Sequence, residues 1–172
     1  MDFLTLAKER YSVRRFSQKP VEQEKIDAIL EAARLAPTAA NAQPQRVLVI
    51  QSPEALAKLK DCTPYHFNAP LAFLVCYDTQ TVWRRKYDGH NSGDVDASIV
   101  GTHMMMEAMD LGIGSTWVMA FDPAATKTAY NLPDHIVPVA FFTMGYPAED
   151  SVPSPMHDKS LGIEEIVFYN KF

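Results

Sequence analysis

Two arginines and a serine recur at every second position near the start of the chain, as Arg10, Ser12 and Arg14. In an extended backbone, alternate side chains point to the same side, so this spacing lines up two guanidinium groups and a hydroxyl. Such a donor set matches a phosphate dianion, which accepts hydrogen bonds on three oxygens. The alternative is a solvated basic stretch whose arginines pair with acids, and the spacing alone favours this alternative.

A second candidate is the segment PTAANAQP, residues 37–44, which begins and ends with proline. Its small residues permit a ligand to approach the backbone closely. The carboxamides of Asn41 and Gln43 offer donors and acceptors that suit the edge of a planar heterocycle. Taken alone, however, the segment is better explained as a connection between a helix and a strand.

Several other kinds of site are excluded by the motifs that the chain lacks. Gly112 and Gly114 suggest a dinucleotide-binding loop, but Trp117 stands where the third glycine belongs. No histidine pair has metal-ligand spacing, residues 88–93 lack the ligands of a calcium loop, and no hydrolase nucleophile motif occurs. By elimination, the chemistry comes from a cofactor, for which the protein supplies a phosphate anchor and a shaped pocket.

The composition is that of one globular domain, which we expect to span residues 1–172. Lys and Arg total 16 against 21 Asp and Glu, the net charge is −5, and 47 % of the residues are hydrophobic. This composition argues against disorder and against a broad nucleic-acid-binding surface, and the longest uncharged apolar stretch, residues 69–77, is too short for a membrane span. The charged N-terminus predicts no signal peptide, and Cys62 and Cys76 have no metal or redox spacing. We therefore expect reduced thiols in a cytoplasmic protein.

The candidate residues need a scaffold of helices and strands. Hydrophobic periodicity and capping residues predict a short helix capped by Asp2 and further helices at residues 21–36, 53–60, 94–111 and 123–131. Strands are predicted at residues 46–51, 71–77, 114–120 and 135–145. Residues 78–93 are predicted to form a polar, mobile excursion. Residues 163–169 are predicted to form a last short strand or a docked tail. The irregular order of helices and strands indicates an α+β fold.

Five segments together resemble the nitroreductase family, whose members are FMN-dependent, obligately dimeric flavoenzymes. These segments are RYSVRRF (10–16), APTAANAQP (36–44), DVDASIVGTHMMMEAMDLGIGSTWV (94–118), MGYP (144–147) and HDKSLGIEEIVFYN (157–170). They occur in the family's order and cover nearly the whole chain. The resemblance implies a mostly antiparallel central sheet flanked by helices. It also implies an arm-exchanged homodimer, in which two FMN molecules sit at the interface.

The resemblance also implies which residues of this chain bind the flavin. The positions that match contacts to the flavin phosphate and polar tail are Arg10, Ser12, Arg14 and, near the C-terminus, Lys159. The positions that match the loop reaching the flavin from the other subunit are Pro37, Thr38, Ala39, Ala40 and Asn41. The positions that match the strand end beside the isoalloxazine ring are Trp117, Val118 and Met119. Near residues 62–66 the sequence departs from the family pattern, so no contact carries over there.

The implied activity is a ping-pong reaction. NADH or NADPH passes hydride to N5 of FMN and leaves, and a small-molecule acceptor such as a nitroaromatic, a quinone or a free flavin takes its place. The alternatives are a specialised flavoenzyme with a defined metabolite as acceptor, and a flavin-binding regulatory protein with little turnover. Acceptor choice is expected to depend on residues 63–65 and 78–93. Within the latter stretch, Arg84, Arg85 and Lys86 either attract the phosphates of the nicotinamide cofactor or form a solvated loop.

Overall fold

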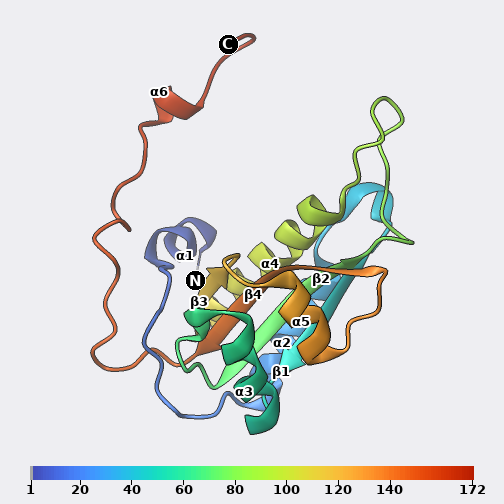
Figure 1. Ribbon diagram of the computed structural model, residues 1–172. Helices are drawn as coiled ribbons and strands as arrows, with labels where there is room; N and C mark the ends of the chain where they lie inside the picture. The colour runs from blue at the N-terminus through green and yellow to red at the C-terminus, as the bar shows by residue number, and fades with distance from the viewer. Residues whose placement is uncertain (1) are drawn as a thin grey trace.

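The computed structural model describes residues 2–172, and one four-stranded antiparallel sheet lies at its centre (Figure 1). The strand order is β1-β2-β4-β3. The strands are β1 (Gln45–Ile50), β2 (Leu71–Asp78), β3 (Gly114–Val118) and β4 (Ile136–Gly145). The longer β2 and β4 occupy the middle, and β1 and β3 form the edges.

Helices cover both faces of this sheet (Figure 1). On one face lie α2 (Gln23–Leu35) and α4 (Gly93–Asp110), and on the other lie α3 (Pro53–Cys62) and α5 (Pro123–Tyr130). The remaining helical segments are α1 (Phe3–Glu9), α6 (Ile163–Ile166) and two 3₁₀ turns, η1 (Ala39–Asn41) and η2 (Pro64–His66). The predicted α+β fold with a mostly antiparallel sheet is therefore confirmed.

Strand β2 is buried along its whole length and divides the core into two layers. Phe73 and Val75 face α2 and α4, whereas Leu74 and Cys76 face α3 and α5. This is the alternation that an extended strand imposes on its side chains. An uninterrupted apolar run is stable in a sheet only where helices cover both faces, so β2 requires both helical layers.

Helix α4 lies unusually close to the sheet at Gly101. A Cβ atom added at Gly101 would stand 2.2 Å from Cζ of Phe142, far inside van der Waals contact. Phe142 is fully buried and also packs edge-on against Trp117, with ring centroids 4.8 Å apart. The glycine therefore sets the spacing between the longest helix and the edge of the sheet that carries Trp117.

Most of the predicted elements are confirmed to within a few residues. The side chains of Asp2, Ser52 and Asp122 accept backbone N–H groups at the starts of α1, α3 and α5, as capping residues do. Gly112 follows α4 with φ of 74°, the left-handed conformation that ends helices. The excursion at residues 79–92 is closed by an isolated bridge between Arg84 and Asn91, and it projects from the end of the molecule opposite α1 (Figure 1).

Of the two alternatives for residues 163–169, the strand is wrong, and the docked tail stays a prediction. Residues Ile163–Ile166 form a short helix instead of a strand, and the chain after about residue 160 extends away from the body (Figure 1). Its large apolar side chains are exposed, among them Ile163, Phe168 and Phe172. A strand pattern is not realised here because no sheet edge of the same chain lies beside this segment to supply hydrogen-bonding partners.

Two further expectations concern the thiols and the membrane. Cys62 and Cys76 are both free, as predicted, and both are buried. Burial raises the pKa of the Cys76 thiol to about 12. None of the helices in the described part of the chain combines the length and the apolar character that crossing a bilayer requires.

We predict that Gly101→Ala lowers the free energy of unfolding by about 1–3 kcal/mol, because the added methyl group overpacks the contact with Phe142. Urea unfolding followed by circular dichroism measures this change. Thr102→Ala, at the neighbouring exposed position on the same helix, is the control and should change stability by about 0.5 kcal/mol or less. Equal stability of the two variants would contradict the close packing of α4.

Candidate functional site

The basic segment after α1 is attached to the edge strand β3. The backbone N–H of Val13 donates to the carbonyl of Ser115 at 3.0 Å, and the hydroxyl of Thr116 donates to the carbonyl of Val13. The Val13 side chain is 2 % exposed and packs where Gly114 leaves room for it. Because Val13 points inward in an extended stretch, Ser12 and Arg14 point outward together, as the spacing predicts.

A polar hollow of about 350 Å³ forms over this segment. Arg10, Ser12 and Arg14 line one side, and Lys159 and His157 from the C-terminal segment line the other. No carboxylate is part of the lining, and none of the ion pairs formed within residues 2–172 involves Arg10, Arg14 or Lys159. Three cations and a hydroxyl without acidic partners form a donor set that fits a phosphate dianion.

The C-terminal segment is held over the hollow by contacts that the sequence analysis did not identify. A ring nitrogen of His157, Nε2, lies 3.1 Å from the carbonyl oxygen of Lys8, and the ring stands edge-on to Tyr11 with centroids 6.3 Å apart. The hydroxyl of Tyr11 lies 3.3 Å from Oγ of Ser151. These partners are about 140 to 150 positions apart in the chain, so no local pattern could have indicated them.

A second hollow, of about 180 Å³, adjoins the first at Arg14. Its lining consists of Arg14, Tyr65, Phe67 and residues 116–120, which include Trp117, Val118 and Met119. The Met119 side chain is 68 % exposed, and Nε1 of Trp117 is buried without a hydrogen-bond partner in residues 2–172. The two hollows together form an elongated site that is cationic at one end and aromatic at the other, which suits a phosphorylated planar ring system.

Phe67 is a candidate ligand contact that the sequence analysis missed, whereas its neighbour in this hollow, Tyr65, lies within residues 63–65, which were expected to influence acceptor choice. The hydroxyl of Thr63 fixes their segment by donating to the carbonyl of Ala120 at 2.7 Å, directly beside the end of β3. Phe67 adopts φ of 51°, a left-handed conformation that a bulky residue rarely takes. The sequence departs from the family pattern near residues 62–66, so the resemblance did not indicate Phe67.

The loop at residues 37–43 lies away from both of these hollows. The N–H of Ala39 donates to the carboxylate of Asp96 at 2.8 Å, near the start of α4, whereas Arg10 lines a cavity with Asp110 and Gly112 at the other end of this helix. The intervening helix is about 20 Å long at the usual rise per residue. A single chain therefore brings together Arg10, Ser12, Arg14, Lys159 and residues 117–119, but keeps Pro37, Thr38, Ala39, Ala40 and Asn41 apart from them.

The cations of the excursion at residues 79–92 also lie away from the two hollows. Arg85 forms a side-chain ion pair with Asp88 through Nε at 2.8 Å, so one of the three charges is neutralised locally. Figure 1 shows the excursion beside the start of α4, at the same end of the molecule as the loop at residues 37–43.

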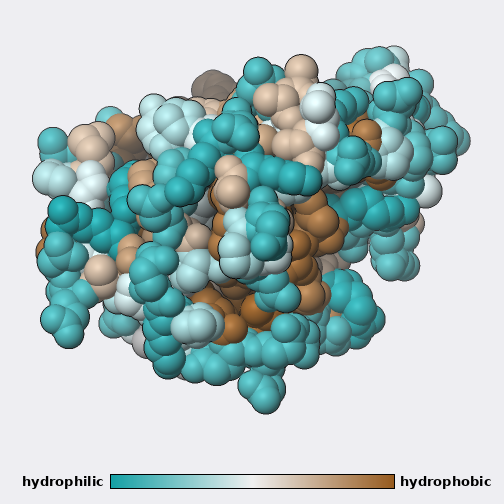
Figure 2. All heavy atoms as spheres, turned by 60° about the horizontal axis from the view of Figure 1, so that its bottom comes forward, coloured by the Kyte–Doolittle hydropathy of each residue, from teal (hydrophilic) through white to brown (hydrophobic). Residues whose placement is uncertain are grey.

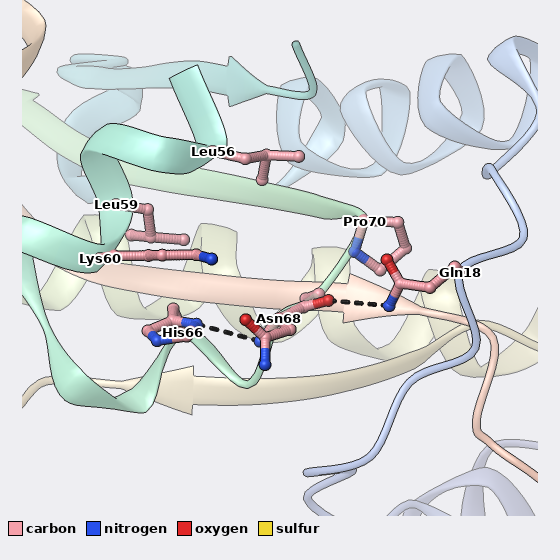
Figure 3. A pocket seen from close by; sticks show the side chains of 8 residues that line it. Gln18, Leu56, Leu59, Lys60, His66, Asn68 and Pro70 are labelled. Carbon is pink, nitrogen blue, oxygen red and sulfur yellow. Dashed lines mark hydrogen bonds between the residues drawn. The ribbon is translucent and has the colours of Figure 1, made fainter. Parts of the chain in front are cut away.

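Another small cavity lies between α3 and the start of β2, and two of its polar side chains, Gln18 and His66, make hydrogen bonds to the backbone of Asn68 (Figure 3). Nδ1 of His66 accepts the N–H of Asn68 at 3.0 Å, and the Gln18 amide donates to the Asn68 carbonyl at 3.1 Å. Partial burial, with a smaller contribution from Lys60, lowers the pKa of His66. We therefore interpret the residues that line this cavity as parts of a turn that these hydrogen bonds stabilise.

Comparison with known proteins gives a consistent result. A family model described as "Nitroreductase family" matches residues 7–63 and 64–146. The crystal structure of a nitroreductase family protein from Clostridium difficile 630 is similar over 100 % of both chains, with a TM-score of 0.94 and 42 % identity.

Two further proteins extend the comparison. A protein of Methanothermobacter thermautotrophicus, the name of which includes NAD(P)H nitroreductase, is 31 % identical over 87 % of this chain and 80 % of its own. An Exiguobacterium sibiricum protein, crystallised in complex with FMN, has the same fold, with a TM-score of 0.84 and 22 % identity over 98 % of this chain and 97 % of its own.

The hydroxyl of Thr116 should be important for anchoring the basic segment. We predict that Thr116→Val lowers the free energy of unfolding by about 1–2 kcal/mol, because the carbonyl of Val13 loses its buried donor. Thr143→Val is the matched control. Thr143 pairs with Thr116 in the sheet, and its buried hydroxyl has no partner among residues 2–172. Removing that hydroxyl should leave stability unchanged or raise it. Denaturant unfolding of both variants tests this, and a reversed order would contradict the assigned contact.

Proposed function

The chain belongs to the nitroreductase family, and on this premise we propose that it is an FMN-dependent NAD(P)H oxidoreductase that reduces small-molecule acceptors. The observation that carries this proposal is the elongated site, whose unpaired cations match a phosphate and whose aromatic end matches a planar ring. The related proteins that bind FMN or are named for NAD(P)H support the same assignment.

In this proposal the residues of the chain have distinct tasks. Arg10, Ser12, Arg14 and Lys159 hold the phosphate, because together they supply positive charge and hydrogen-bond donors without a competing carboxylate. Residues 117–119, with Tyr65 and Phe67, border the ring and keep water from one side of it. When bound, FMN supplies hydride transfer between NAD(P)H and an acceptor.

We propose a ping-pong order, in which the reductant and then the acceptor use the same open face. Nitroaromatics, quinones and free flavins are the acceptor classes that suit a flat, partly aromatic surface. No residue of this chain is needed as an acid or base, since protons can come from solvent. A defined metabolite as acceptor is the alternative, and it would require specific polar contacts from residues 63–65 or 78–93.

We further propose that the working unit is a homodimer of two single-domain chains. The separation of the loop at residues 37–43 from the phosphate hollow, by about 20 Å of helix, supports a site completed by a second chain. The C-terminal segment exposes Leu161, Ile163, Phe168 and Phe172, and apolar atoms gather in a hollow on another face of the molecule (Figure 2). Exposed apolar surface of this kind is typical of an interface.

The free, buried thiols of Cys62 and Cys76 are compatible with the cytoplasmic location that we propose for this dimer.

The purified protein tests the function directly. We expect it to be yellow, to show flavin absorbance bands that bleach with NADH or NADPH without oxygen, and to recover colour on addition of a quinone or nitroaromatic. In solution its mass should be twice the 19.3 kDa of one chain. A colourless protein that does not take up added FMN would refute the enzymatic proposal, and a stable monomer would refute the shared site.

Two adjacent arginines offer a matched test of the phosphate site. Arg14→Ala should weaken FMN binding about 10- to 150-fold, because a charge-assisted hydrogen bond to the phosphate is lost. Arg15→Ala should leave it unchanged, because Arg15 points away and pairs with Asp150 on the surface. Titration of each apoprotein with FMN, followed by quenching of flavin fluorescence, measures both constants. Equal affinities of the two variants would show that Arg14 does not bind the phosphate.

A further inference from the structure

The loop at residues 38–43 holds an unusual backbone conformation. Ala40, Asn41 and Gln43 adopt φ of 51°, 53° and 50°, respectively, in the left-handed region. Asparagine tolerates this region well, but each of the other residues is disfavoured there by about 1 kcal/mol or more. Such conformations persist only where surrounding contacts enforce them, and they occur most often at functional sites.

Contacts inside the loop explain part of this conformation. The N–H of Gln43 donates to Oγ1 of Thr38 at 3.0 Å, and the N–H of Asn41 donates to the carbonyl of Thr38 at 3.0 Å. The Gln43 amide donates to Oδ1 of Asn41 at 3.1 Å. These bonds shape the loop, but they do not fix it relative to the rest of the molecule.

The attachment to the helical layer is made by Asp96 in the first turn of α4. Its side chain is 1 % exposed; one carboxylate oxygen accepts the N–H of Ala39 at 2.8 Å, and the other accepts the hydroxyl of Ser92 at 2.6 Å. Ser92 is itself 6 % exposed. The start of a helix favours a negative charge, but burying a carboxylate this deeply is costly unless hydrogen bonds such as these two compensate for the lost solvation.

We propose that Asp96 is a positioning residue, which sets the geometry with which residues 39–41 of one subunit meet the flavin ring held by the other. This inference rests on the proposed function, because it takes the flavin as the group that the loop contacts. Ala40 and Asn41 are exposed in the single chain, so the loop presents them outward while Asp96 holds its backbone from below. The small side chains of Ala39 and Ala40 leave the backbone as the contacting surface.

The test separates the ring from the phosphate by comparing FMN with riboflavin, which lacks the phosphate. Asp96→Ala should weaken binding of both flavins by a similar factor, on the order of tenfold, because a charge-assisted hydrogen bond that orders the loop is lost. Arg14→Ala should weaken FMN binding and leave riboflavin binding unchanged. Fluorescence quenching gives the dissociation constants, and the visible circular dichroism of the bound flavin reports the ring environment.

Two further variants distinguish positioning from a general structural role. Asp96→Asn can still accept from Ala39 and can donate to Ser92, so it should restore the affinities and the wild-type dichroism. Ser92→Ala removes the other hydrogen bond to the same carboxylate and should keep near-wild-type flavin binding even if stability falls.

Wild-type affinity and dichroism in Asp96→Ala, or equal losses in Ser92→Ala and Asp96→Ala, would overturn the inference. Failure of the wild-type protein to bind FMN would instead overturn the proposed function. If Asp96→Ala does not fold, the comparison of Asp96→Asn with Ser92→Ala decides. A loss of affinity in Asp96→Asn alone would contradict positioning by hydrogen-bond geometry.

Discussion

The complete burial of β2 is the constraint on which the rest of this molecule depends. A strand that is apolar on both faces must be covered twice, and it must be paired along both edges. The helices α2 and α4 cover one face, α3 and α5 cover the other, and β1 and β4 supply the pairing. The inner position of β2 in the sheet and the presence of a helical layer on each face follow from this requirement.

The candidate site lies where this core ends. Strand β3 is the edge strand beside β4, and its free side accepts the basic segment of the N-terminus through Val13. Residues 154–160 lie over the same place, so segments close to the two ends of the sequence meet at one sheet edge. Cations can gather there at low cost because the hollow is open to solvent and contains no carboxylate.

Helix α4 connects the two functional ends of the molecule. Its final turn borders the cavity beside Arg10, and its first turn carries Asp96, which holds the loop at residues 38–43. The close contact of Gly101 with Phe142 fixes the helix on the sheet between these ends. One rigid element thus separates two halves of the proposed flavin site, and a second chain would have to bring them together.

By itself, the sequence determined most of the elements, and its resemblance to a family indicated the type of ligand. The alternation of Arg10, Ser12 and Arg14 around an inward-pointing Val13, the buried strand and the caps Asp2, Ser52 and Asp122 all act over a few residues, so local physics suffices to predict them. The order of five motifs was enough to indicate the family.

The tertiary structure decided the rest, because contacts between distant segments carry no local pattern. Only the fold brings His157 to Lys8 and Tyr65 to the end of β3, gives residues 163–166 a helical conformation, and places Asp96 beneath Ala39. Asp96 illustrates the difference. In the sequence it is one more acidic residue at the start of a helix, and only burial and a hydrogen bond across more than fifty residues reveal what its carboxylate holds.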